Sequence, residues 1–153
     1  MAARSFMLVI HRRVARPKVK GAGRLLVVRT MYSALQFRNL PVGLARRVLH
    51  ELLEVPHFHY IREISDLWLL FDDQGASDQW PLLAWAWITP WTDEILAIRM
   101  IDVPEKHRGH DYALQLITEV GELTGKELLP HGVIHSARNY WLKMGWPEEC
   151  WLV

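Results

Sequence analysis

The chain has 153 residues, half of them hydrophobic, and a formal net charge of +1 at neutral pH. This length suits one domain with a single core that needs no disulfide or structural metal to be stable. The apolar runs fall short of the roughly 18 to 20 residues that a membrane-spanning helix requires, so we expect no transmembrane segment. Cys150 is the one cysteine, which excludes an internal disulfide framework and favours a reducing, cytoplasmic location.

The charges are divided unevenly along the chain. Residues 1–50 hold eleven Lys or Arg and no acidic residue, whereas residues 51–153 hold seven basic and all seventeen acidic residues. We therefore predict a basic N-terminal arm over residues 1–24, ahead of a folded domain over residues 25–153. Such an arm favours an acidic partner: nucleic acid, an anionic membrane surface or an acidic protein face. An organellar targeting peptide and an extension upstream of a natural start at Met31 are the alternative interpretations.

In the first half of the domain, the sequence pattern predicts strands around one amphipathic helix. An apolar strand, "RLLVVRT" (24–30), precedes "NLPVGLARRVLHELLEVP" (39–56), where apolar residues recur at helical spacing until Pro56. Three strands follow, joined by the short polar links that are typical of an antiparallel meander. These strands are "DLWLLFDD" (66–73), "LLAWAWI" (82–88) and "EILAIRMIDV" (94–103).

The second half predicts two helices with a strand between them. "EKHRGHDYALQLITEV" (105–120) runs from a loop into a helix that Gly125 ends. A short strand, "ELLPHGVI" (127–134), broken by Pro130, leads to the helix "SARNYWLKMGW" (136–146), and "CWLV" is a final edge strand. This order makes an α+β, or mixed α/β, domain. In the last helix we expect Ser136 as N-cap, Gly145 as the stop, and a buried face of Ala137, Tyr140, Trp141 and Met144.

Eight tryptophans are unusual in a chain of this length. On strand 82–88 the alternation places Trp85 and Trp87 on one face and Ala84 and Ala86 on the other. Large core residues are the plain interpretation. The rings equally suit a cleft for a ligand or the interface of a homodimer.

The loop before residue 113 has the chemistry of a phosphate cradle. Unpaired N–H groups at a helix start, together with the helix dipole, favour a pyrophosphate. Gly109 lets the backbone come close, and Lys106, Arg108 and the flanking histidines add positive charge. Asp111 opposes this because its carboxylate competes with an anion for the same positive end. The alternative is an ordinary helix start in a solvated loop.

Two segments of the domain resemble the GNAT family of N-acetyltransferases. "VPEKHRGHDYALQL" (103–116) is similar to the family's acetyl-CoA loop, R/Q-x-x-G-x-G/A, with Arg108 at the first position and Ala113 at the last. Asp111 stands where the pattern has its first fixed glycine. "ARNYWLKMGW" (137–146) is similar to A-x-x-[F/L]-Y-x-K-x-G-F, but the tyrosine that often serves as general acid falls on Trp141, one residue after Tyr140.

The resemblance implies a GNAT-like fold: a central, twisted, mostly antiparallel sheet flanked by helices. It also implies acetyl transfer from acetyl-CoA, the co-substrate, to an amine acceptor, with the amine entering beside the Trp-rich strands. The acidic balance of the domain favours a cationic amine. The candidate catalytic residues are Tyr140 as acid and Asp102 or His135 as base. The candidate acetyl-CoA-binding residues are Ile101, Val103, Arg108, Gly109, His110, Asp111, Tyr112, Ala113 and Lys143.

A second hypothesis keeps the fold without the reaction. Asp111 replaces a fixed glycine of the acetyl-CoA loop, and Trp141 replaces the tyrosine that often serves as general acid. The basic arm is also unusual. The domain would then be an inactive binding or structural module, an assembly component or inhibitor. We expect no metal site, because "HELLE" (50–54) lacks the second His of a zinc-protease motif and no Cys or carboxylate cluster completes the other histidine pairs.

Overall fold

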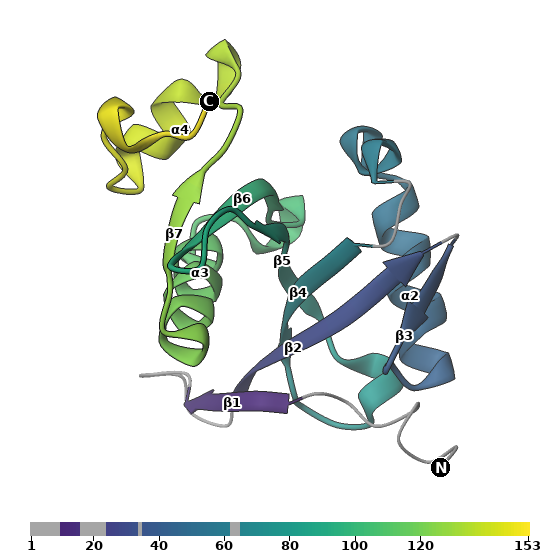
Figure 1. Cartoon of the computed structure of the whole chain (residues 1–153). Helices are drawn as coiled ribbons and strands as arrows, with labels where there is room; N and C mark the ends of the chain where they lie inside the picture. Colours follow the sequence, from purple (N-terminus) through teal and green to yellow (C-terminus); the bar gives the residue numbers. More distant parts are fainter. Residues whose placement is uncertain (1–9, 16–23, 34, 62–64) are drawn as a thin grey trace.

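The computed structural model describes residues 10–15, 24–33, 35–61 and 65–153. Element labels follow Figure 1. The strands are β1 (Ile10–Ala15), β2 (Arg24–Ser33), β3 (Gln36–Arg38), β4 (Ser65–Asp72), β5 (Leu82–Pro90), β6 (Ile95–Asp102) and β7 (Glu127–Pro130). The α-helices are α2 (Val42–Leu53), α3 (Tyr112–Thr124) and α4 (Arg138–Lys143), and five short 3-10 turns connect them: η1 (Pro56–Tyr60), η2 (Ser77–Gln79), η3 (Glu105–His107), η4 (His135–Ala137) and η5 (Glu148–Cys150).

One sheet organises the domain, with the strand order β1-β2-β4-β5-β6-β7 and β3 paired to β2. The described pairs are antiparallel except β6 with β7, which is parallel. The helices pack on both faces of this sheet (Figure 1). The prediction of an α+β domain with a mostly antiparallel sheet flanked by helices is confirmed.

The alternation of side chains along the strands divides the core in two. On β5, Ala84, Ala86 and Ile88 face the core under α3 and α4, while Leu82 and Trp85 face the core under α2. Trp87 is partly buried against the same α2 side as Trp85, so the predicted faces of this strand are confirmed. Small residues on one face and rings on the other let α3 approach the sheet closely.

The parallel pair β6 and β7 separates partway along its length. The pairing ends at Ile98 and Pro130, although β6 continues to Asp102. The N–H of His131 still donates to Ile98 O (3.1 Å), after which the chain leaves the sheet and builds the lobe that carries α4 (Figure 1). Trp146 ties this lobe back to β7, because its Nε1–H donates to Leu128 O (2.9 Å).

The C-terminal elements are shorter than we predicted. Strand 127–134 breaks at Pro130 as predicted, because proline has no N–H to continue a ladder, and it does not resume after that residue. The predicted helix 136–146 is a 3-10 turn followed by α4, and Ser136 is not its N-cap, since that position falls on Ala137. The predicted edge strand at "CWLV" is a single bridge between His131 and Leu152.

The sequence analysis did not predict two strands, β1 and β3. β3 has three residues, too few for a pattern. β1 pairs antiparallel with β2 although it lies inside the predicted arm 1–24; the parts of that arm before Ile10 and after Ala15, up to residue 23, lie outside the described residues. Within the described ranges, no helix combines the length and hydropathy that a membrane span requires.

Candidate functional site

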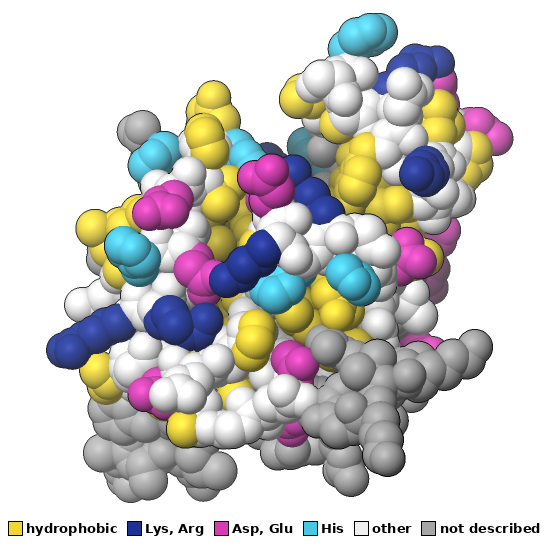
Figure 2. Space-filling model, turned by 180° about the vertical axis from the view of Figure 1, so that it is seen from behind, with side chains coloured by type: hydrophobic (Ala, Val, Ile, Leu, Met, Phe, Trp, Pro, Cys, Tyr) yellow, Lys and Arg dark blue, Asp and Glu magenta, His cyan; other side chains and the backbone are white. Residues whose placement is uncertain are grey.

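A cavity of about 590 Å³ opens where β6 and β7 have separated. We call it the α3 cavity, because its walls are the end of β6, the loop that leads into α3, the first turn of α3, and α4. In the space-filling view the surface is hollowed between the C-terminal lobe and the rest of the molecule (Figure 2). The motif in "VPEKHRGHDYALQL" and the motif in "ARNYWLKMGW" therefore meet across one cavity.

Two residues of the loop before α3 have a left-handed backbone. Gly109 has φ 86°, and Asp111 has φ 59° and ψ 27°, which is the left-handed region that favours glycine. Asp tolerates this region better than most side chains. The position where the resemblance predicts a glycine thus has a backbone that favours glycine, but it carries a carboxylate.

The carboxylate of Asp111 is exposed at the start of α3. It caps none of the described backbone N–H groups of that helix, while its C=O accepts the first helical bond from Gln115 N–H (3.0 Å). The unpaired N–H groups of the first turn give this end of α3 a partial positive charge. The α3 cavity therefore begins at a helix end that favours an anion. The N-cap residue at this end, Asp111, is itself negatively charged.

Arg108 fastens the loop to the end of β6. Its Nε–H donates to Val103 O (3.0 Å), and its Nη2 lies 3.6 Å from Asp102 Oδ1. The Arg108 side chain is 59% exposed and that of Asp102 is 19% exposed. Among the described residues, these two contacts hold the end of β6 and leave other N–H donors of the exposed guanidinium unpaired.

Tyr140 and Trp141 have opposite surroundings. Tyr140 lines the α3 cavity and is 41% exposed, which contradicts our placement of it on the buried face of its helix. Trp141 is 7% exposed and packs edge-on against Trp146, with ring centroids 5.7 Å apart. Of the two residues, Tyr140 is the one whose hydroxyl can meet a ligand.

The pKa of Tyr140 favours a proton donor. Burial raises the pKa of the phenol above its usual value, the Asp102 carboxylate raises it further, and the Arg108 guanidinium offsets part of this rise. The phenol is therefore protonated throughout the neutral range. A protonated hydroxyl beside a carboxylate is an acid–base pair in one cavity.

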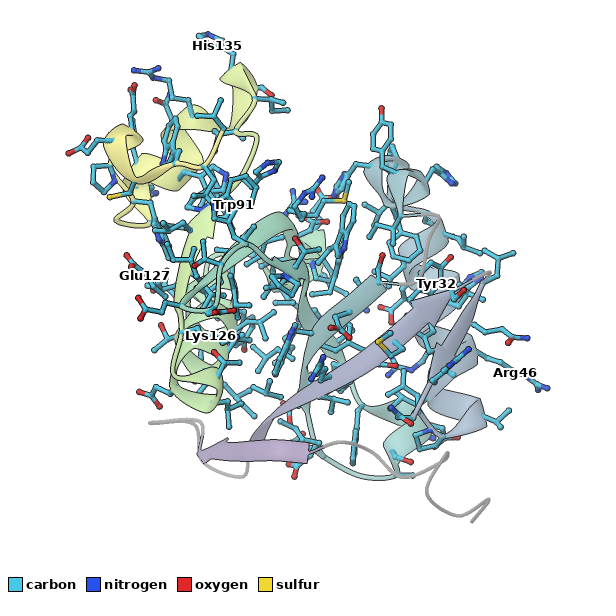
Figure 3. The ribbon with its side chains drawn as sticks, viewed as in Figure 1. Tyr32, Arg46, Trp91, Lys126, Glu127 and His135 are labelled. Carbon is cyan, nitrogen blue, oxygen red and sulfur yellow. The ribbon has the colours of Figure 1, made fainter. Side chains whose placement is uncertain are left out.

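Most of the predicted site residues converge on this cavity. The described lining does not include His110 or His135. His110 stacks on Tyr112 with ring centroids 5.4 Å apart, and His135 lies at the tip of the C-terminal lobe, pointing away from the sheet (Figure 3). The predicted residues that do line it are Ile101, Asp102, Val103, Arg108, Gly109, Asp111, Tyr112, Ala113, Tyr140 and Lys143.

Sequence reasoning missed three residues of the lining: His107, Leu114 and Met144. His107 belongs to the loop that we treated as a source of positive charge, and Leu114 follows the motif directly. Met144 lies one turn after Tyr140 on the same face of α4, so the helical spacing was the signal that could have found it.

Comparisons with protein-family models, with curated proteins and with solved structures found no match to this chain. Groups of three or more His, Cys, Asp or Glu that could hold a metal ion are not found within the described ranges.

Proposed function

We propose that this protein is an acyl-CoA-dependent N-acyltransferase of the GNAT type, which transfers an acetyl group from acetyl-CoA to an amine. The observation that carries the proposal is the left-handed backbone at Asp111, at the N-terminus of α3 and on the wall of the α3 cavity. The loop supplies N–H groups for the pyrophosphate, and Arg108 and Lys143 supply the positive charge.

The residues around the cavity match the needs of acyl transfer. Asp102 accepts the proton that the amine loses as its nitrogen forms the C–N bond with the thioester carbonyl carbon. The C–S bond then breaks, and Tyr140 donates its proton to the departing thiolate. The end of β6, from Ile101 to Val103, offers backbone groups to the pantetheine arm.

A catalytically inactive binding module is the second candidate. Two observations favour it: the exposed Asp111 carboxylate opposes an anion at the helix end, and Trp141, at the position of the family's usual acid, is buried. This candidate keeps the fold and cavity but predicts no turnover. It would use another surface, such as the Trp-rich strands or the basic arm.

Calorimetric titration with acetyl-CoA separates the two candidates at the binding step. We expect saturable binding, and release of CoA thiol when an amine is added. No detectable heat at millimolar acetyl-CoA would reject the enzyme proposal. Binding without thiol release, for a broad set of primary amines, would support the inactive module.

A pair of glycine variants makes this test specific to the loop. Gly109→Ala places a Cβ at φ 86°, and Gly75→Ala does the same at φ 73° in an exposed turn far along the chain. Both substitutions strain the backbone to a similar extent. We expect Gly109→Ala to lose acetyl-CoA affinity and Gly75→Ala to keep it; equal affinities would place the ligand elsewhere.

We also propose that the basic N-terminal segment binds an acidic partner and that the protein acts in the cytoplasm. Because β1 lies within this segment, a deletion of residues 1–24 would remove a strand. Neutralising Arg16, Lys18 and Lys20 with Gln leaves β1 intact. Salt-sensitive binding to a polyanion such as heparin should weaken in this triple variant, and unchanged binding would exclude the segment as the contact.

A further inference from the structure

Another cavity, of about 800 Å³, meets the α3 cavity at Asp102 and Arg108, which line both. We call it the α2 cavity, since much of its wall comes from the last turn of α2 and the η1 turn that follows. Leu82 and Trp85 of β5 and residues Pro104–Lys106 of the β6–α3 loop form the rest. The two cavities thus approach one carboxylate from different directions.

The α2 cavity has the opposite electrostatic character to the α3 cavity. It begins at the C-terminal end of a helix, where unpaired carbonyls carry a partial negative charge. Its lining holds four carboxylates, those of Glu51, Glu54, Asp102 and Glu105, against the two cationic side chains of Lys106 and Arg108. Glu54 is 76% exposed, and Glu51 keeps an ion pair with Arg47 at 3.1 Å. A ligand in this cavity is favoured if it is cationic.

Trp85 forms part of an apolar wall of the α2 cavity. The side chain is fully buried, lines the cavity and stacks on His57 with ring centroids 5.8 Å apart. Its indole N–H has no hydrogen-bond partner among the described residues. An ammonium group, which is itself only a donor, cannot pair with this N–H, so the contribution of Trp85 to the cavity is the apolar wall that it forms with Leu82, against which the carbon chain of a ligand can lie.

We infer that the α2 cavity binds the acceptor, and that this acceptor is a diamine or polyamine: one nitrogen reacts beside Asp102 while a second, cationic nitrogen lies against Glu51 and Glu54. The inference depends on the proposed acyl transfer for the acceptor's role, but not for its binding. The reacting nitrogen gives its proton to Asp102 and becomes the amide, whereas the second nitrogen stays charged throughout. The anionic acetyl-CoA at the N-terminus of α3 and the cationic diamine at the C-terminus of α2 would then react where the two cavities meet.

Three amines of matched length test the inference. All three have five carbons: cadaverine carries a second ammonium on the fifth carbon, pentylamine carries only hydrogen there, and in δ-aminovalerate the fifth carbon belongs to a carboxylate. Calorimetry on the full chain should give an affinity for cadaverine at least fivefold tighter than for pentylamine, with δ-aminovalerate weakest. Equal affinities for the three, or no binding by cadaverine, would overturn the inference.

Charge-neutral variants place the ligand within the cavity. Glu54→Gln and Glu51→Gln should each reduce the preference for cadaverine over pentylamine, and the double variant should abolish it. Glu127→Gln, at an exposed position on β7 outside this cavity, is the matched control (Figure 3) and should keep the preference. A preference that survives in the double variant would contradict the inference without any reference to turnover.

A binding experiment and a turnover experiment separate this inference from the proposed function. If all three amines bind alike and are acetylated at equal rates, acyl transfer stands and the diamine inference fails. If cadaverine binds in the α2 cavity but acetyl-CoA neither binds nor reacts, the ligand class stands and the transferase proposal fails. In the NMR spectrum, a shift of the Trp85 indole N–H signal with cadaverine would report the site directly.

Discussion

Asp102 and Arg108 stand together where the α3 and α2 cavities meet, with Asp102 Oδ1 3.6 Å from Arg108 Nη2. The carboxylate ends β6, and the guanidinium belongs to the loop that begins the cradle. Their pairing therefore links the position of the proposed base to the position of the proposed phosphate-binding loop. Any change at Arg108 alters both.

Arg108→Ala should weaken acetyl-CoA binding by about tenfold or more, because hydrogen bonds to charged groups contribute about 1.5–3 kcal/mol. Arg108→Lys should lie between, since it keeps the charge but loses the Nε–H bond to Val103 O and the planar fork. Calorimetric titration measures both. The pair with Asp102 is largely exposed on the Arg108 side, so we expect little change in the free energy of unfolding.

Arg46→Ala is the control for this comparison. Arg46 lies on the exposed outer side of α2, pointing away from the sheet (Figure 3), and it lines neither the α3 nor the α2 cavity. Its loss changes the net charge by the same amount. If Arg46→Ala weakened acetyl-CoA binding as much as Arg108→Ala, the effect would come from overall charge and the role of Arg108 would be wrong.

Asp111 variants separate the charge of the loop from its backbone conformation. Asp111→Gly, Asp111→Asn and Asp111→Ala all remove the carboxylate from the positive end of α3, so each should bind acetyl-CoA more tightly than the wild-type chain. Only Gly and Asn accept φ 59° readily. In chemical denaturation, Asp111→Ala should therefore be about 1 kcal/mol less stable than Asp111→Asn. Affinities that do not rise in the Asn variant would show that the carboxylate points away from the ligand.

Tyr140→Phe should lower kcat and leave the affinity for acetyl-CoA nearly unchanged. A general acid contributes about 10² to 10⁴ in rate, and the hydroxyl is the one atom removed. Steady-state kinetics with calorimetry distinguishes the two quantities. Tyr32→Phe is the matched control: Tyr32 lies at the far end of β2, outside the α3 cavity (Figure 3), and should keep full activity.

The two tyrosines should behave alike in alkaline stability. Burial is the main cause that raises the pKa of each phenol above 10.0 in the folded chain. The folded state therefore favours the protonated phenol, and this stabilisation is fully present below pH 10 and is lost as the pH rises through the raised pKa. Either Phe variant should flatten the decline in unfolding free energy above pH 10. An unchanged decline in both would contradict the stated environments.

The sequence predicted what depends on local pattern. The alternation of Trp85 and Trp87 with Ala84 and Ala86 requires only a strand between two apolar layers. Gly125 was expected to end α3, and it does so with φ 67°. Ten of the twelve candidate site residues share one cavity because two short segments, each with its own spacing, carried most of them.

What the sequence could not predict depends on residues far apart in the chain. The α2 cavity brings together Glu51, Trp85 and Asp102, from three elements with no common pattern. The rotation of α4 has a different cause, because it depends on how neighbouring side chains pack and not on a periodic pattern. Tyr140 and Trp141 are both large and partly apolar, and only the packing of Trp141 against Trp146 decides which of them faces the cavity.

Trp141 gives the sharpest test of that rotation. Because this residue is buried in the core under α4, Trp141→Ala should cost about 3–5 kcal/mol of unfolding free energy, and Trp141→Phe should cost less. Trp141→Tyr introduces the tyrosine that the GNAT resemblance predicts at this position, but places its hydroxyl in the core. We therefore expect no gain in kcat from Trp141→Tyr, and no recovery when it is combined with Tyr140→Phe. Recovery of kcat in that double variant would show that α4 presents position 141 to the substrate, and the assignment of Tyr140 as the acid would then be wrong.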